Sequence, residues 1–138
     1  MFYHKFFYCW LASLIAMFVL SYSWHGLILN DFDQLAYSRT LFIILFSIVY
    51  FGIGFILTLL YQVPYLEKKP LLKGLFFGCL MGILVYLISF VIGVSFIAAP
   101  TIKFIAIDAA WQVIEQSCGG LAIGLTWQYV TLQERRVV

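Results

Sequence analysis

Residues 104–130 read FIAIDAAWQVIEQSCGGLAIGLTWQYV, an apolar stretch long enough to cross a membrane that nevertheless carries acidic residues. Asp108, Gln112 and Glu115 stand at positions i, i+4 and i+7. On an α-helix, at about 100° per residue, all three fall on one stripe. Counted from Lys103 at the expected interface, Glu115 lies about 18 Å along the helix, near the middle of the hydrocarbon core. The stretch therefore predicts a membrane helix with one polar face.

An acidic side chain at the centre of a membrane helix costs about 2.5 to 3.5 kcal/mol. This stripe is therefore expected to face protein or water and not lipid, with one or both carboxyls protonated. Two interpretations of Asp108 and Glu115 stay open. They serve a function, as ionisable groups within a membrane commonly do, or they are only hydrogen-bond partners between helices, worth about 0.6 kcal/mol each on average.

The composition of the whole chain is that of a membrane protein. Of its 138 residues, 64% are hydrophobic and 10% are charged, whereas soluble domains average about 25% charged residues. Four apolar stretches are long enough to span a bilayer. We predict an all-α membrane protein, a single transmembrane domain over residues 1–138, folded as a four-transmembrane-helix bundle with spans at about residues 6–29, 41–61, 71–98 and 104–130.

The connections between these spans differ in character. Residues 30–40 mix polar and apolar side chains, which predicts a short interfacial segment between spans one and two. Residues 62–70 contain two prolines and a charge cluster, so a tight turn is expected there. Pro100 separates the last two spans, and residues 133–136 are expected to form a short charged tail.

Basic residues are distributed unequally between the two ends of the predicted bundle. An even number of spans with this distribution places both termini in the cytoplasm. The net charge of +2 gives no indication of a nucleic-acid partner. One end carries Lys5, Lys68, Lys69, Lys73, Arg135 and Arg136, and the other carries only Arg39 and Lys103.

A candidate partner for the acidic stripe is His25, at the outer end of span one on the same side of the membrane as Asp108. A cluster of this kind could hold a cation, relay protons or hydrogen-bond a polar headgroup. The plainer interpretations are that His25 is an interfacial residue and that the loop carboxylates are solvated charges or a helix cap. The residues expected at the outer mouth are Trp24, Asn30, Asp31, Asp33 and Trp111.

Glycines recur at helical spacing in the last two spans. Gly74, Gly78 and Gly82 form a doubled GxxxG, which predicts close helix packing within the bundle or between protomers. Gly120 and Gly124 form another GxxxG away from the acidic stripe. Gly119 lies on the stripe itself and is expected to let a partner helix approach Glu115. Three cysteines lie in apolar runs without metal-binding spacing, so neither a disulfide framework nor a zinc site is indicated.

The chain contains none of the GxSxG, HExxH, Walker or GxGxxG motifs of familiar enzymes. We therefore expect a non-enzymatic protein, an accessory or structural subunit of a membrane complex or homo-oligomer, whose partners are membrane lipids and other subunits or copies of itself. A small proton or cation pathway or carrier built on the acidic stripe is the alternative. Binding of a lipid, quinone or pigment in an aromatic cleft is the third, and no other cofactor is predicted.

Two segments resemble an uncharacterised family of small bacterial membrane proteins with four spans. These are residues 18–32, FVLSYSWHGLILNDF, and the closing helix with IDAAW at 107–111 followed by Gly119, Gly120 and Gly124. The resemblance implies a four-helix protein of the bacterial inner membrane with unknown activity. It singles out Trp24, His25, Asp108 and Trp111.

Overall fold

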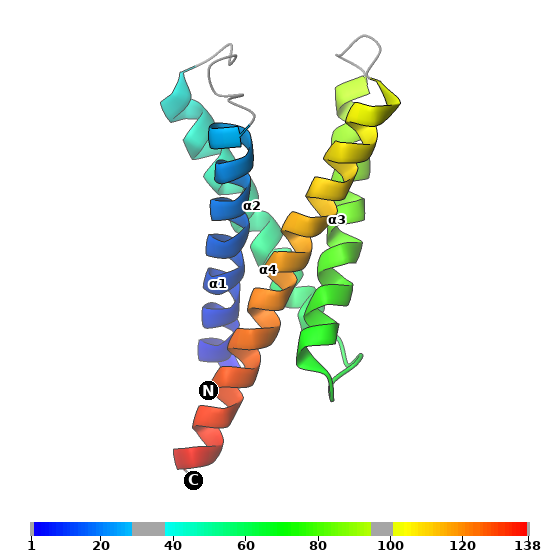
Figure 1. The fold of residues 1–138 in the computed structure, drawn as a ribbon. Helices are drawn as coiled ribbons and strands as arrows, with labels where there is room; N and C mark the ends of the chain where they lie inside the picture. The colour runs from blue at the N-terminus through cyan, green and yellow to red at the C-terminus, as the bar shows by residue number, and fades with distance from the viewer. Residues whose placement is uncertain (1, 29–37, 95–100, 138) are drawn as a thin grey trace.

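The computed structural model describes residues 2–28, 38–94 and 101–137. These residues are helical apart from Ser38, Thr101 and the connection at 62–69, and no strand occurs among them. Both ends of the chain lie at the same end of the bundle as that connection (Figure 1). The elements are α1 (Phe2–Tyr22), a π-helical continuation η1 (Ser23–Ile28), α2 (Arg39–Tyr61), α3 (Pro70–Val94) and α4 (Ile102–Val137).

Within the described residues, three helical segments are long and apolar enough to cross a membrane: His4–Ile28, Arg39–Tyr61 and Pro70–Val91. Their outward side chains are large and apolar, with exposed fractions such as 62% for Ile48 and 66% for Val91. An integral membrane protein accounts for both observations, because lipid and not water then covers these surfaces. Helix α4, which carries Asp108 and Glu115, is not among the three.

The helix bounds follow from local chemistry. Ser38 caps α2, its Oγ accepting a hydrogen bond of 3.3 Å from the backbone N–H of Leu41. Pro70 opens α3, where a proline needs no amide hydrogen. The expected continuation of span one is confirmed as far as Ile28, and the predicted interfacial segment falls mostly on residues 29–37, outside the described residues. Residues 133–136, expected to be a tail, instead continue α4 as helix.

Helix α4 packs most extensively against α3, at backbone contact distance. A Cβ added to Gly74 would lie 2.1 Å from the carbonyl oxygen of Gly120, and one added to Gly78 would lie 2.5 Å from that of Gln116. At Gly82 the nearest atom would be Val113 Cα, at 2.6 Å. The close packing predicted for the glycines is therefore confirmed, and it occurs within the chain.

The face of α4 that carries Glu115 packs against α1. A Cβ at Gly119 would lie 2.6 Å from Met17 Cγ and 3.1 Å from Ser13 Oγ. Met17 and Ile123 are fully buried in this contact. Gly119 thus brings α1 close to Glu115, as the sequence predicted.

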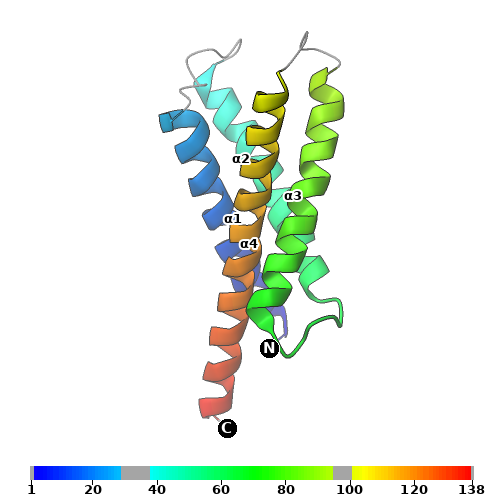
Figure 2. The same ribbon diagram turned by 45° about the vertical axis from the view of Figure 1, so that its right-hand side comes forward.

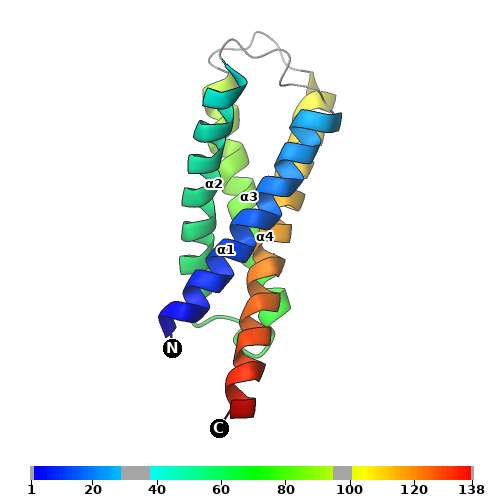
Figure 3. The same cartoon turned by 90° about the vertical axis from the view of Figure 1, so that its left-hand side faces the viewer.

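The helices are arranged as the corners of a bundle with α4 between α1 and α3. Two views at right angles (Figures 1 and 3) show this arrangement. The intermediate view in Figure 2 shows α4 in front, with α1 on one side and α3 on the other. Helix α4, which carries Asp108 and Glu115, therefore lies beside both α1 and α3.

The glycine contacts predict a contrast between two alanine substitutions. Gly74→Ala places a methyl group into the backbone of α4 and should destabilise the protein by about 1 to 3 kcal/mol, the usual penalty for overpacking. Gly52→Ala, in α2, meets no atom within 4 Å. It should be neutral or slightly stabilising because alanine is the better helix former. Thermal unfolding in detergent measures both, and equal stability of the two variants would contradict the packing described.

Candidate functional site

Glu115 is completely excluded from solvent, with 0% of its surface exposed. It stands on the face of α4 that also carries Gly119 and Ile123, at the spacing i, i+4 and i+8. Since Gly119 has no side chain, α1 can lie directly beside this face. The carboxyl group therefore lies between helices, as the sequence required of it, and not against lipid.

Two other helices supply hydroxyl groups to this carboxyl. Tyr50, in α2, donates a short hydrogen bond to Glu115 Oε1. The Tyr50 hydroxyl oxygen also lies 2.7 Å from the Ser21 Oγ of α1, and both residues are buried. Ser21, Tyr50 and Glu115 thus form one chain of hydrogen bonds across three helices. We refer to these three residues as the carboxyl network.

Several buried polar atoms around this network make no hydrogen bond with the described residues. They include the second carboxyl oxygen of Glu115, Oε2, as well as Gln116 Oε1 and Ser13 Oγ. Gln116 donates from Nε2 to Glu115 Oε1 at 3.3 Å, which leaves its own oxygen without a donor. An unsatisfied buried polar group costs about 1 to 3 kcal/mol. Buried polar groups without a partner are uncommon in folded proteins, so their concentration around Glu115 needs an explanation.

A pair of stacked indoles lies one helical turn from Glu115. Trp24 of η1 and Trp111 of α4 have ring centroids 4.2 Å apart and planes inclined by 12°. Trp111 Nε1 is buried without a well-aligned hydrogen bond, although it interacts with the Glu115 carboxyl. His25, beside Trp24, is also close enough to interact electrostatically with Glu115. Trp24, His25, Trp111 and Glu115, all singled out from the sequence, are therefore brought together.

The π-helix η1 carries Trp24 and His25, two of the residues that lie near Glu115. Residues Ser23–Ile28 form a π-helix after the regular turns of α1. π-Helical turns are rare and occur frequently at functional sites. The Ser23 hydroxyl donates to the carbonyl oxygen of Val19 at 2.7 Å where the two geometries meet. No local motif in the sequence predicted the change from α-helix to π-helix at Ser23.

The acidic stripe does not act as one cluster. Asp108 and Gln112 are partly buried, whereas Glu115 is fully buried. Asp108 interacts electrostatically with Tyr86 of α3, and the backbone carbonyl of Gln112 lies against Gly82 of the same helix. Glu115 instead faces α1 and α2. Glu115 is thus enclosed by protein, whereas Asp108 and Gln112 keep part of their surface exposed, and the members of the stripe have different neighbours.

The remaining predicted residues are not gathered at this site. Asn30, Asp31 and Asp33 lie outside the described residues. Among residues 2–28, 38–94 and 101–137, no group of three or more His, Cys, Asp or Glu side chains is placed to hold a metal ion. The structure adds Tyr50 and Ser21, which sequence reasoning did not select. A tyrosine at the middle of the second span was the available signal.

Comparison with known proteins identifies no relative, since no family model, curated protein or solved structure matches the chain. The resemblance to small four-span bacterial proteins thus stays a prediction. What the chain does has to be argued from its own residues.

Removing the phenol hydroxyl tests the carboxyl network directly. Tyr50→Phe removes the donor from α2, so Glu115 Oε1 keeps only the 3.3 Å hydrogen bond from Gln116, and it should destabilise the protein by about 1 to 3 kcal/mol, the usual cost of losing a hydrogen bond to a carboxyl group. Tyr65→Phe is the matched control, because Tyr65 is 50% exposed. Thermal unfolding in the same detergent compares them. A Tyr50→Phe variant as stable as Tyr65→Phe would contradict the network.

Proposed function

We propose that this chain is a non-enzymatic membrane protein whose Glu115 takes up and releases a proton, as a small carrier. The observation that supports this most is the carboxyl network. The proposal includes α4 as a fourth span, since it lies along α1 and α3, both apolar enough to cross the membrane. It also includes cytoplasmic termini, from the excess of basic residues at that end, and a bacterial inner membrane.

The carboxyl network is suited to both protonation states of Glu115. When Glu115 is ionised, Tyr50 donates to it and accepts from Ser21. When Glu115 carries a proton on Oε1, that proton is donated to Tyr50, and Tyr50 donates to Ser21. Each hydroxyl is both donor and acceptor, so neither state requires the oxygens to move. This is the property that a proton relay needs.

The surroundings favour a carrier over an open pore. On the side of Glu115 toward the chain termini, Met17, Leu57 and Ile123 are fully buried with 0% exposure. Between these apolar side chains the described residues supply only single polar atoms, such as Ser13 Oγ, which are too few partners for a file of water molecules. Toward the other end lie Trp24, His25 and Trp111, whose indole and imidazole nitrogens offer polar groups. Access to Glu115 from that end, past the indole pair, is therefore the favoured route.

Proton flux into liposomes tests the proposal. Purified protein is reconstituted around a pH-sensitive dye, and acidification of the lumen is followed under an imposed potential. The wild type should acidify faster than empty vesicles, and Glu115→Gln should return the rate to the empty-vesicle level, because an amide takes up no proton. The glutamine oxygen still accepts a hydrogen bond from Tyr50, so folding is retained.

Asp108→Asn is the matched comparison in the same helix. Asp108 is partly buried and outside the carboxyl network, so flux should fall less than in Glu115→Gln. Wild-type flux equal to that of empty vesicles would contradict the proposal. So would a Glu115→Gln rate equal to the wild-type rate.

A second candidate is the expected role as a subunit that acts by association. The glycine pairs that suggested it are occupied within the chain, so they no longer support it. A separate surface favours it: an apolar groove of about 590 Å³ between α1 and α4, where Thr126, Tyr129 and Gln133 supply polar atoms. Polar side chains on a lipid-facing surface suit a hydrogen-bonded partner helix.

Light scattering in mild detergent tests this second candidate. An associating subunit should give a mass above that of one 15.9 kDa chain or a co-purifying membrane protein. Replacing Thr126 with leucine should shift the population toward the monomer, whereas Thr131→Val, outside the groove, should not. A monomeric wild type without a partner would exclude this role.

A further inference from the structure

A cavity of about 300 Å³ lies at the end of the bundle where both termini are found, away from the carboxyl network. It is lined by Tyr61, Gln62, Glu67, Lys73 and Trp127. Tyr61 is the last residue of α2 and Lys73 stands in the first turn of α3. The cavity thus lies at the ends of two candidate spans, the depth at which lipid headgroups meet aromatic side chains.

Lys73 is the unusual member of this lining, because only 6% of its surface is exposed. Its ammonium lies over the Tyr61 ring, 4.8 Å from the centroid. In the described part of the chain it forms no hydrogen bond and no ion pair within 4.0 Å. A cation–π contact supplies about 0.5 to 2 kcal/mol. Among the described residues, the Lys73 ammonium therefore has no anion in direct contact, and Glu67 of the same lining attracts it only from beyond 4.0 Å.

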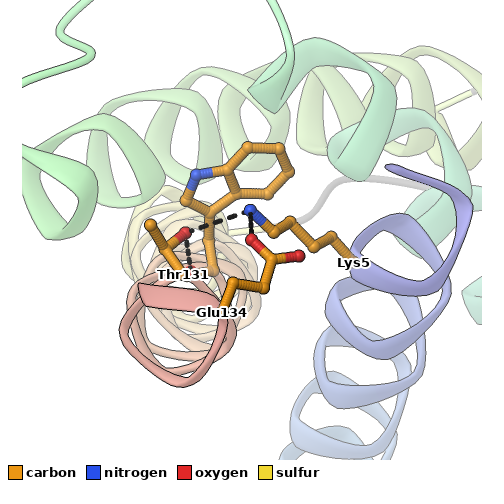
Figure 4. A network of polar contacts seen from close by, with 4 residues as sticks. Lys5, Thr131 and Glu134 are labelled. Atoms are coloured by element: carbon orange, nitrogen blue, oxygen red, sulfur yellow. Dashed lines mark hydrogen bonds and ion pairs between the residues drawn. The ribbon is translucent and has the colours of Figure 1, made fainter. Parts of the chain in front are cut away.

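The aromatic wall of the cavity is held in place from its other side. The rings of Tyr61 and Trp127 are 5.6 Å apart. Lys5 lies 5.5 Å above the Trp127 ring and pairs with Glu134, and it donates to Thr131 Oγ1 at 3.5 Å. Figure 4 shows the Lys5 ammonium between Thr131 and Glu134. Because Lys5 already has these partners, Lys73 is the cation available to a ligand in the cavity.

Glu67 adds a negative charge to the same lining. It does not pair with Lys73 within 4.0 Å, although both side chains line the cavity. Separated opposite charges beside two aromatic rings complement a ligand that carries an anion and an ammonium a few bonds apart. Lipid headgroups with a phosphodiester and a primary amine have this chemistry and occur at this depth.

We propose that this cavity binds the headgroup of an aminophospholipid of the phosphatidylethanolamine type. The phosphodiester pairs with Lys73, and the ammonium donates hydrogen bonds to Glu67 beside the Tyr61 and Trp127 rings. Gln62 also lines the cavity. This site is independent of proton uptake at Glu115.

Native mass spectrometry of the full chain in detergent tests the site, with phosphatidylethanolamine titrated against phosphatidylcholine, phosphatidylglycerol and inorganic phosphate. The wild type should bind one phosphatidylethanolamine at least about tenfold more tightly than phosphatidylcholine, whose quaternary ammonium donates no hydrogen bond to Glu67. Inorganic phosphate should not displace the lipid at equal concentration. Displacement would identify a free-phosphate site and overturn the proposal.

Two substitutions test the contributions of Lys73 and Glu67 to lipid binding one at a time. Lys73→Gln should weaken phosphatidylethanolamine binding by at least about tenfold, the effect of losing one charged hydrogen bond, whereas Lys68→Gln, on the exposed connection, should leave it unchanged. Glu67→Gln should remove the preference over phosphatidylcholine and retain binding that depends on Lys73. Unchanged lipid affinity in Lys73→Gln would overturn the site. Should that variant not fold, an undiminished headgroup preference in Glu67→Gln would overturn it equally.

Discussion

Burial of a carboxyl group between membrane helices is the constraint on which the arrangement depends. Without hydrogen-bond partners, an acidic group at this depth would destabilise the fold by several kcal/mol. Tyr50 of α2 supplies such a partner to Oε1 and is itself joined to Ser21 of α1, so one hydrogen-bond chain through Glu115 connects three helices. The same contact fixes how α4 faces its neighbours.

The glycine packing of α3 on α4 makes this burial feasible. Backbone contact at Gly74, Gly78 and Gly120 leaves no room for lipid between the two helices. Helix α4 is thereby held beside α3, and a different face of α4 meets α1 at Gly119. The α3 side of α4 thus provides close backbone packing, and the α1 side carries Glu115. A membrane provides little hydrophobic drive between helices, so close backbone contact carries much of this association.

Much of the fold could be predicted from the sequence. Apolar runs located the helices, and glycine spacing located the contacting faces of α3 and α4, because both are periodic properties of the chain itself. The inward orientation of Glu115 followed from the energetic cost of the alternative. The closing helix was expected only to residue 130, but it extends through the charged residues to Val137.

The partners of Glu115 could not be predicted, since they depend on where other helices lie. Tyr50 is one of nine tyrosines, and although it lies at the middle of the second span, the sequence does not show which helix its hydroxyl group faces. The π-helical turn at Ser23–Ile28 has no sequence signature, although it carries Trp24 and His25. Lys73 was counted as one of several basic residues that orient the chain. Its burial beside Tyr61 depends on the turn that joins α2 to α3.

Infrared spectroscopy of the protein in lipid nanodiscs, titrated with acid in D₂O, tests most directly whether Glu115 is a buried proton-binding group joined to Tyr50. The account predicts a carbonyl stretching band of a protonated carboxylic acid that is missing in Glu115→Gln and shifts in frequency in Tyr50→Phe, where its hydrogen bond is removed. A spectrum in which Glu115→Gln changes no carboxyl band at any pH would contradict it.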